Sequence, residues 1–115
     1  MKFTSISDKN LSVNFETALF DGLAPDGGLF MPESIPEFSV QERNKLSDSN
    51  FHEAAKLTLR KWLGDQIPSS DLDKIVSRAL NFDIPIVDVG SFKVMELFHG
   101  PTMAFKDVAA RFLAV

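Results

Sequence analysis

Apolar residues recur at helical spacing in the middle of the chain. In residues 51–63 they fall three or four positions apart and form one continuous face. Residues 70–80 carry a second face of this kind, and the connection between the two is short. We therefore predict an antiparallel helix pair that buries both faces in a shared core. The predicted core residues are Phe51, Ala55, Leu59, Trp62, Leu72, Ile75, Val76 and Leu80.

Polar residues that cap helices predict where these helices begin. In a capping box, a Ser, Thr or Asn side chain accepts from a backbone N–H three residues later, and an acidic residue there bonds back. Three pairs have this spacing: Ser39 with Glu42, Asn50 with Glu53, and Ser70 with Asp73. The first pair predicts a further helix that extends to about residue 46, and Gly64 is expected to end the helix of residues 51–63.

The first 32 residues predict short strands, a helix and a turn. Residues 2–6 alternate weakly and are expected to form a strand. Residues 15–19 carry apolar positions at helical spacing after Ser12, and Gly22 is expected to end that helix. The run Pro25-Asp26-Gly27-Gly28 predicts a turn, which leads into an apolar strand that stops at Pro32.

The last third of the chain changes from helix to strand and back. Residues 84–89 and 92–98 flank Gly90-Ser91, the pattern of a β-hairpin with a two-residue turn. From Phe105 the spacing is helical again, and this apolar face continues to Val115 without a residue that would end it. We therefore expect an α+β fold, with a small, mostly helical domain in residues 1–81 and the start of a second domain in residues 82–115. We also expect the chain to be the amino-terminal piece of a longer protein.

Composition narrows the classes of function. The net charge of −4 and the pI near 5.0 argue against nucleic acid or an anionic membrane as a partner. The absence of Cys excludes disulfides and thiolate sites, and two scattered His residues argue against a metal cluster. The first residues lack the apolar core of a signal peptide, so a cytoplasmic location is the expectation.

Lys106 is the most unusual residue of the last predicted helix. It lies in the first turn, where the helix dipole disfavours a cation. Asp107 is explained by the same dipole and by Arg111 four residues later, the favourable order for an ion pair. The helical neighbours of Lys106 are apolar and offer no acidic partner: Ala109, Ala110 and Leu113.

Apolar surroundings favour a neutral lysine, the form that attacks an aldehyde. The helix dipole contributes only about 0.3 to 1 kcal/mol to this preference, so the rest of the protein would have to remove the amine from water. The same helix start could attract a phosphate through its free backbone N–H groups. From the residues alone, a solvated lysine on a surface helix is the favoured interpretation.

Two motifs resemble the threonine synthase family. The first surrounds the lysine and has the pattern of the family signature: His99-Gly100-Pro101-Thr102-x-Ala104-Phe105-Lys106-Asp107. The second is similar to a hallmark of the family's small amino-terminal domain: Asp21-Gly22-Leu23-Ala24-Pro25-Asp26-Gly27-Gly28-Leu29-Phe30-Met31-Pro32. Met103 stands where many members have Leu, a substitution that conserves volume.

The resemblance implies a fold type II enzyme that uses pyridoxal 5'-phosphate (PLP), in which two α/β domains hold the cofactor between them. The implied reaction converts O-phospho-L-homoserine and water to L-threonine and phosphate. Lys106 would be the catalytic lysine that binds PLP as a Schiff base and then moves protons at the substrate's α and β carbons. The hairpin and the helix that follows it would be the first elements of the catalytic domain.

Other residues of the signature have two interpretations each. His99 would lie near the substrate phosphate, or it would pack and hydrogen-bond within its loop. Thr102 would cap the helix of Lys106 or contact substrate. Phe105, like Phe98, would be a core residue or would lie against the cofactor ring.

Two other functions remain open at this point. One is another fold type II PLP lyase, or a phospholyase that resembles threonine synthase. The other is a small acidic domain that only binds a partner, in which Lys106 has no special role. Because Phe105, Phe112 and Leu113 lack a cover in this chain, we expect them to fold back onto the helical core or to pair with a second copy.

Overall fold

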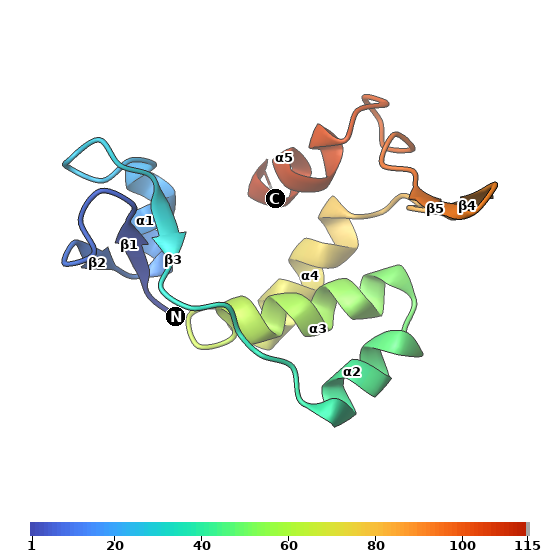
Figure 1. Ribbon diagram of the computed structural model, residues 1–115, viewed down its shortest axis with the longest axis horizontal. Coiled ribbons are helices and arrows are strands. Elements are labelled where there is room, and N and C mark those ends of the chain that lie inside the picture. The colour runs from blue at the N-terminus through green and yellow to red at the C-terminus, as the bar shows by residue number, and fades with distance from the viewer. Residues whose placement is uncertain (115) are drawn as a thin grey trace.

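The two amphipathic faces predicted from the sequence form the centre of the fold. They belong to α3 (Phe51–Leu63) and α4 (Ser69–Ala79), which pack against each other, while α2 (Val40–Ser47) contacts α3. The computed structural model describes residues 1–114 (Figure 1). With short antiparallel strands beside these helices, it confirms the predicted α+β class.

The core lies mainly along one side of α4. The side chains of Leu72, Val76 and Ala79 are fully buried, and Leu80 is nearly so. Partly buried residues from α3, from the segment after α4 and from the last helix pack against the cluster of Val76, Ala79 and Leu80: Phe51, Ala55, Leu59, Phe82, Val108 and Phe112. Most of the predicted core is therefore confirmed.

Trp62 and Ile75 are partly buried, as Phe51, Ala55 and Leu59 also are, and they differ from the prediction only in where they pack. Neither belongs to the cluster around Val76 and Leu80. A regular apolar stripe predicts which side of a helix turns inward, but the residues that border the covered strip keep contact with solvent. Trp62 therefore lies outside the buried cluster that joins α3, α4 and α5.

Of the three predicted capping boxes, one forms completely and a second forms its side-chain cap only. Ser39 and Glu42 make both hydrogen bonds of the capping box, and Asn50 accepts from the backbone N–H of Glu53. The third prediction is wrong: α4 begins after Pro68, and no side chain caps its first turn. The backbone of Pro68 already provides the extended residue before the helix, so Ser70 lies inside it.

The capping residue Glu42 also has a perturbed pKa. Hydrogen bonds from Lys61 and Ser39 lower the pKa of Glu42 from its ordinary 4.5 to about 2.

The amino-terminal strands form a small antiparallel sheet in the order β2-β1-β3. They are β1 (Phe3–Ser5), β2 (Ser12–Val13) and β3 (Phe30–Pro32). The helix α1 (Phe15–Asp21) follows β2 and ends at Gly22, as predicted. Its first turn is capped by Asn14, which accepts from the backbone N–H of Thr17. This cap was not predicted, although Asn directly before an apolar helical position is a typical signal.

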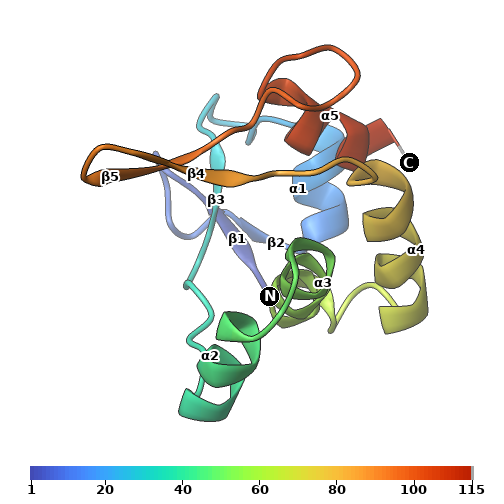
Figure 2. The same cartoon turned by 90° about the vertical axis from the view of Figure 1, so that its right-hand side faces the viewer.

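The predicted hairpin is present and leads to the last helix. It consists of β4 (Ile86–Val89) and β5 (Phe92–Met95), and its turn begins at Gly90 with φ of 60°. A positive φ at the first turn residue only is the type II′ geometry, which favours Gly there. The hairpin projects from the body of the molecule, whereas α5 (Lys106–Ala114) returns to lie beside the end of α4 (Figures 1 and 2).

The last helix covers the core with only part of its apolar face. Val108 and Phe112 pack against the buried cluster, as folding back requires. Phe105 and Leu113 remain largely exposed, at 68% and 66%. The expected return to the helical core is therefore confirmed for Phe112. Phe105 and Leu113 do not fold back onto the core, and for them the alternative, pairing with a second copy, stays a prediction. Within residues 1–114, no helix has the length and apolar character needed to cross a bilayer.

Burial of α4 predicts which substitution destabilises the fold most. Leu72→Ala should lower the free energy of unfolding by about 2 to 5 kcal/mol, because the side chain is fully buried and leaves a cavity. Leu113→Ala is the matched control and should cost below about 1 kcal/mol, because that side chain is mostly in solvent. Urea denaturation followed by circular dichroism measures both. Equal losses for the two variants would contradict this assignment of the core.

Candidate functional site

Lys106 is the first residue of α5, so the predicted position in the first turn is confirmed. Its side chain is exposed, and it takes part in none of the ion pairs among residues 1–114. Ala109, Ala110 and Leu113, on the same side of the helix, are exposed as well. The described residues therefore leave this face of α5 open, and they do not remove the amine from water.

Asp107 has a different role from the one predicted. It is the one charged side chain among residues 1–114 that is buried, with 4% exposure. Its two oxygens accept from the backbone N–H and the hydroxyl of Thr102, at 2.8 and 2.9 Å. The predicted ion pair with Arg111 does not form. Thr102 thus bonds to the helix that carries Lys106 as a donor to the Asp107 side chain and not as the predicted cap, while its contact with substrate stays a prediction.

Arg111 instead binds the carboxyl end of α4. Its guanidinium donates to the carbonyl of Ala79 at 2.7 Å, the carbonyl of Arg78 at 3.1 Å and the side chain of Asn81 at 2.7 Å. The carbonyls at a helix end lack partners within the helix and carry partial negative charge, so a guanidinium fits there. This contact fixes the lysine helix to the helical core.

The loop before α5 is held closely against Asp107. Gly100 is buried, and a Cβ at this position would lie 2.4 Å from a carboxylate oxygen of Asp107. Met103 has a backbone φ of 54°, a left-handed conformation that is uncommon for residues other than Gly. Its backbone N–H donates to the carbonyl of Gly100 at 3.0 Å. The close packing of residue 100 against Asp107 therefore requires Gly at this position. The left-handed backbone at Met103 places a strained turn three residues before Lys106.

His99 is held by its own loop. Its Nε2 lies 2.6 Å from a carboxylate oxygen of Glu96, and its ring stacks on Phe98 with centroids 4.6 Å apart. The loop contacts expected of His99 are therefore present, and its place near the substrate phosphate stays a prediction. Glu96 was not predicted, and no spacing rule outside a helix indicates this pair. Phe98 and Phe105 are 52% and 68% exposed, so the expectation that they are core residues is wrong within this chain.

The second motif, residues 21–32, forms a tightly packed turn. Asp26 accepts from the backbone N–H of Gly28 and from the hydroxyl of Ser5, which is almost fully buried. Gly27 has φ of 79°, and a Cβ on Gly28 would lie 2.2 Å from the hydroxyl oxygen of Ser5. These contacts fix β3 beside β1 and require Gly at both positions. This motif therefore has a structural role in the small sheet.

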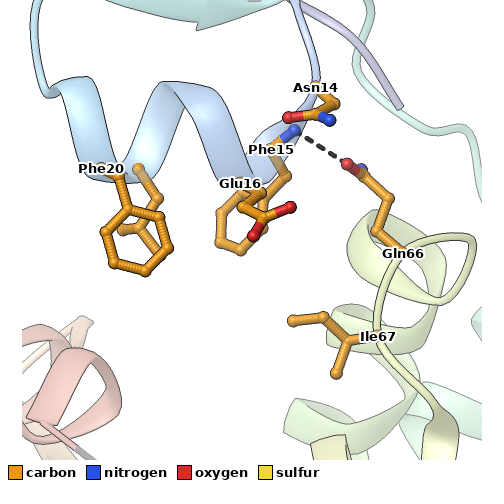
Figure 3. Close-up of a pocket in the computed structure, with 7 residues that line it drawn as sticks. Asn14, Phe15, Glu16, Phe20, Gln66 and Ile67 are labelled. Carbon is orange, nitrogen blue, oxygen red and sulfur yellow. Dashed lines mark hydrogen bonds between the residues drawn. The ribbon is translucent and has the colours of Figure 1, made fainter.

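A hollow at the start of α1 has no residue of the predicted site. Gln66, in the connection between α3 and α4, accepts from the backbone N–H of Phe15 at 2.8 Å (Figure 3). Its amide nitrogen also donates to the carbonyl of Met1. The lining residues are Asn14, Phe15, Glu16, Leu19, Phe20, Gln66 and Ile67. In the described part of the chain, no three His, Cys, Asp or Glu residues gather in a way that could hold a metal ion.

Comparisons with known proteins agree on one family. A family model described as "Threonine synthase N terminus" matches residues 2–80. The threonine synthase of Escherichia coli strain K12 is 39% identical over 115 residues, and the match covers 99% of this chain and 27% of that protein. The protein named Threonine synthase-like 2 from Xenopus laevis is also 39% identical, over 116 residues, with 95% and 25% covered. The chain thus spans about a quarter of the length of these relatives.

Solved structures give the same result. The crystal structure of the E. coli threonine synthase has a TM-score of 0.92 and 39% identity, with 99% of this chain and 27% of that one covered. The structure of PLP-bound threonine synthase from Brucella melitensis has a TM-score of 0.91 and 38% identity, with 99% and 26% covered. The yeast enzyme has a TM-score of 0.85 and 34% identity, with 97% and 25% covered.

The contact of Arg111 with α4 predicts how firmly the lysine helix is attached. Arg111→Ala should lower the free energy of unfolding by about 1 to 3 kcal/mol, since hydrogen bonds from a charged donor are lost and two carbonyls lose their partner. Lys93→Ala is the control and should cost below about 0.5 kcal/mol, because its pair with Asp88 is exposed. Thermal or urea unfolding measures both. If the two variants were equally stable, Arg111 would not hold α5 in place.

Proposed function

Because this chain belongs to the threonine synthase family, we propose that it is the amino-terminal part of a PLP-dependent threonine synthase. The proposed reaction converts O-phospho-L-homoserine and water to L-threonine and phosphate. The observation that carries the proposal is that Lys106, the lysine of the family signature, lies exposed on an open face at the start of α5. The match to threonine synthases extends over 99% of the chain and so includes this segment.

The primary amine of Lys106 is a suitable group to bind the aldehyde of PLP. A primary amine that is exposed and without an ion pair among the described residues is free to bond covalently to an aldehyde. The open face formed by Lys106, Ala109 and Ala110 provides room for a second domain to close over that amine. We propose that this closure, rather than the residues of this chain, removes the amine from water.

Each residue of the site then has a proposed part. When bound, PLP supplies the electron sink for the bonds that change. Lys106 holds the cofactor covalently and later moves protons at the α and β carbons of the substrate. Thr102 and Asp107 hold the loop before the lysine. His99, fixed by Glu96, and the exposed Phe105 are proposed to lie near the cofactor or the substrate phosphate.

The proposed division of the chain follows the same logic. Residues 1–81 would be an amino-terminal domain and residues 82–115 the start of the catalytic domain. The bonds from Arg111 to Ala79 and Asn81 cross this division and support a fixed relation between the two parts. The pyridine-nitrogen partner and the cofactor-phosphate loop would lie in the remaining three quarters of a protein of the relatives' length. For the whole protein we propose a cytoplasmic location and no membrane or nucleic-acid partner.

A second candidate is a related phospholyase. The match to Threonine synthase-like 2 from X. laevis is as high in identity as the match to the E. coli threonine synthase. The described residues include the proposed lysine but not the residues that would bind a substrate phosphate further along. Product analysis with phosphohomoserine distinguishes the two candidates, because only a threonine synthase forms L-threonine from it.

The lysine assignment is tested in the protein of full family length. Lys106→Ala should abolish the absorbance of lysine-bound PLP and the release of phosphate from phosphohomoserine. Lys106→Arg should do the same, since a guanidinium does not replace the amine as a nucleophile. Lys93→Ala, which removes an exposed lysine of the hairpin, is the matched control and should leave both unchanged. Borohydride reduction followed by peptide mapping should find PLP on Lys106, and PLP on another lysine would refute the assignment.

The 115-residue chain alone should be inactive. Half of a site formed between two domains does not position a substrate against the cofactor. A phosphate-release assay with phosphohomoserine and added PLP measures this, with the longer protein as positive control. Phosphate released by residues 1–115 above the rate of the Lys106→Ala variant would show that the site is complete within this chain.

A further inference from the structure

Asp107 is an unusual residue to find buried next to an exposed lysine. An isolated carboxylate is costly to remove from water unless hydrogen bonds compensate it. None of the ion pairs among residues 1–114 includes Asp107, and its two hydrogen bonds both come from Thr102. The side chain is therefore used to hold one loop residue rather than to balance a neighbouring charge.

The two bonds close the loop onto the helix that carries the lysine. Thr102 precedes α5 by four residues, and Asp107 is the second residue of the helix. Met103, which lies between them, has a left-handed backbone conformation. Gly100, which precedes Thr102, packs directly against the carboxylate of Asp107. A strained turn persists only where its surroundings determine it, and Asp107 is the contact that spans this one.

We propose that Asp107 is a positioning residue for Lys106. By fastening the amide and the hydroxyl of Thr102, it fixes residues 100–105, and this fixes the direction in which the first turn of α5 presents the amine. The inference rests on the proposed function of Lys106. In this inference Asp107 acts through hydrogen bonds to the loop. Its position in the sequence indicates a different role, namely charge interactions with the helix dipole and with Arg111.

The two explanations predict different behaviour for Asp107→Asn. Asn is nearly the same shape, its oxygen accepts from the amide of Thr102, and its NH2 group donates to the hydroxyl oxygen of Thr102. It therefore keeps both contacts while it removes the charge. Asp107→Ala removes the contacts and the charge together. If positioning by hydrogen bonds is the role, Asn retains the function and Ala loses it.

The test uses the holoenzyme of full family length. The rate at which the apoprotein binds added PLP covalently, followed by absorbance, should fall by about tenfold to a hundredfold in Asp107→Ala and by less than about threefold in Asp107→Asn. The kcat should fall with this rate, while the KM for phosphohomoserine changes little. Leu72→Ala is the matched control, because its side chain is fully buried but lies outside the cluster against which α5 packs, so it should destabilise the core and leave the PLP rate unchanged.

Hydrogen exchange gives a readout that does not depend on PLP. In the apoprotein, Asp107→Ala should increase exchange in the segment 100–105 by at least about tenfold, because the Thr102 amide loses its acceptor. Asp107→Asn should preserve the protection. If Asp107→Ala does not fold, Thr102→Val decides instead, because it removes only the hydroxyl bond and should still slow PLP binding severalfold.

The results separate the inference from the proposed function. If Asp107→Ala binds PLP at the wild-type rate, or if Asn is as impaired as Ala, the positioning role is refuted. If Thr102→Val binds PLP at the wild-type rate, the role assigned to the Thr102 hydroxyl is refuted too. If Lys106→Ala still binds PLP covalently, the proposed function fails, and hydrogen exchange still reports whether Asp107 fixes the loop.

Discussion

The burial of α4 between α3 and α5 is the constraint on which the rest of the arrangement depends. Val76, Ala79 and Leu80 contact α3 through Phe51 and Leu59 on one side, and α5 through Val108 and Phe112 on the other. Burial of this kind contributes roughly 1.5 to 3 kcal/mol for each large apolar side chain. Apolar packing between α4 and α5 does not by itself fix their orientation. The guanidinium of Arg111 fixes it, because it donates hydrogen bonds to the carbonyls at the end of α4. The helix that carries Lys106 is thus placed by the amino-terminal helices.

The site itself divides into a fixed part and an open part. The loop of residues 100–105 is fixed, since Gly100 packs on Asp107 and Thr102 bonds to it twice. His99 is fixed in the same region by Glu96 and Phe98. The face of α5 with Lys106 and Leu113 is open. A prepared amine on a rigid helix, beside an uncovered apolar surface, is the arrangement expected where a second domain completes a catalytic site.

The two motifs of the family have different physical purposes. Residues 21–32 maintain the small sheet, because Asp26, Gly28 and Ser5 form one closely packed group. Residues 99–107 combine a structural anchor, the contact between Thr102 and Asp107, with the amine that we propose binds PLP. Substitutions in the first motif should therefore act through stability, whereas substitutions in the second should change the proposed cofactor site in a stably folded protein.

The sequence alone determined most elements of this protein and indicated the residue that we propose binds the cofactor. Periodicity predicted α3, α4 and the hairpin, and local rules predicted the caps at Ser39 and Asn50 and the stop at Gly22. These features depend on neighbours within a few positions, so the sequence contains them. The resemblance of the signature then indicated Lys106. The tertiary structure decided the partners of Asp107 and Arg111, the start of α4 at Ser69, the partial burial of Trp62 and the exposure of Phe105. Four-residue spacing places Asp107 and Arg111 within reach of each other, but each forms stronger contacts elsewhere. The end of α4 offers carbonyls to Arg111, and the loop offers two donors to Asp107, and only the packing of distant segments brings those groups together.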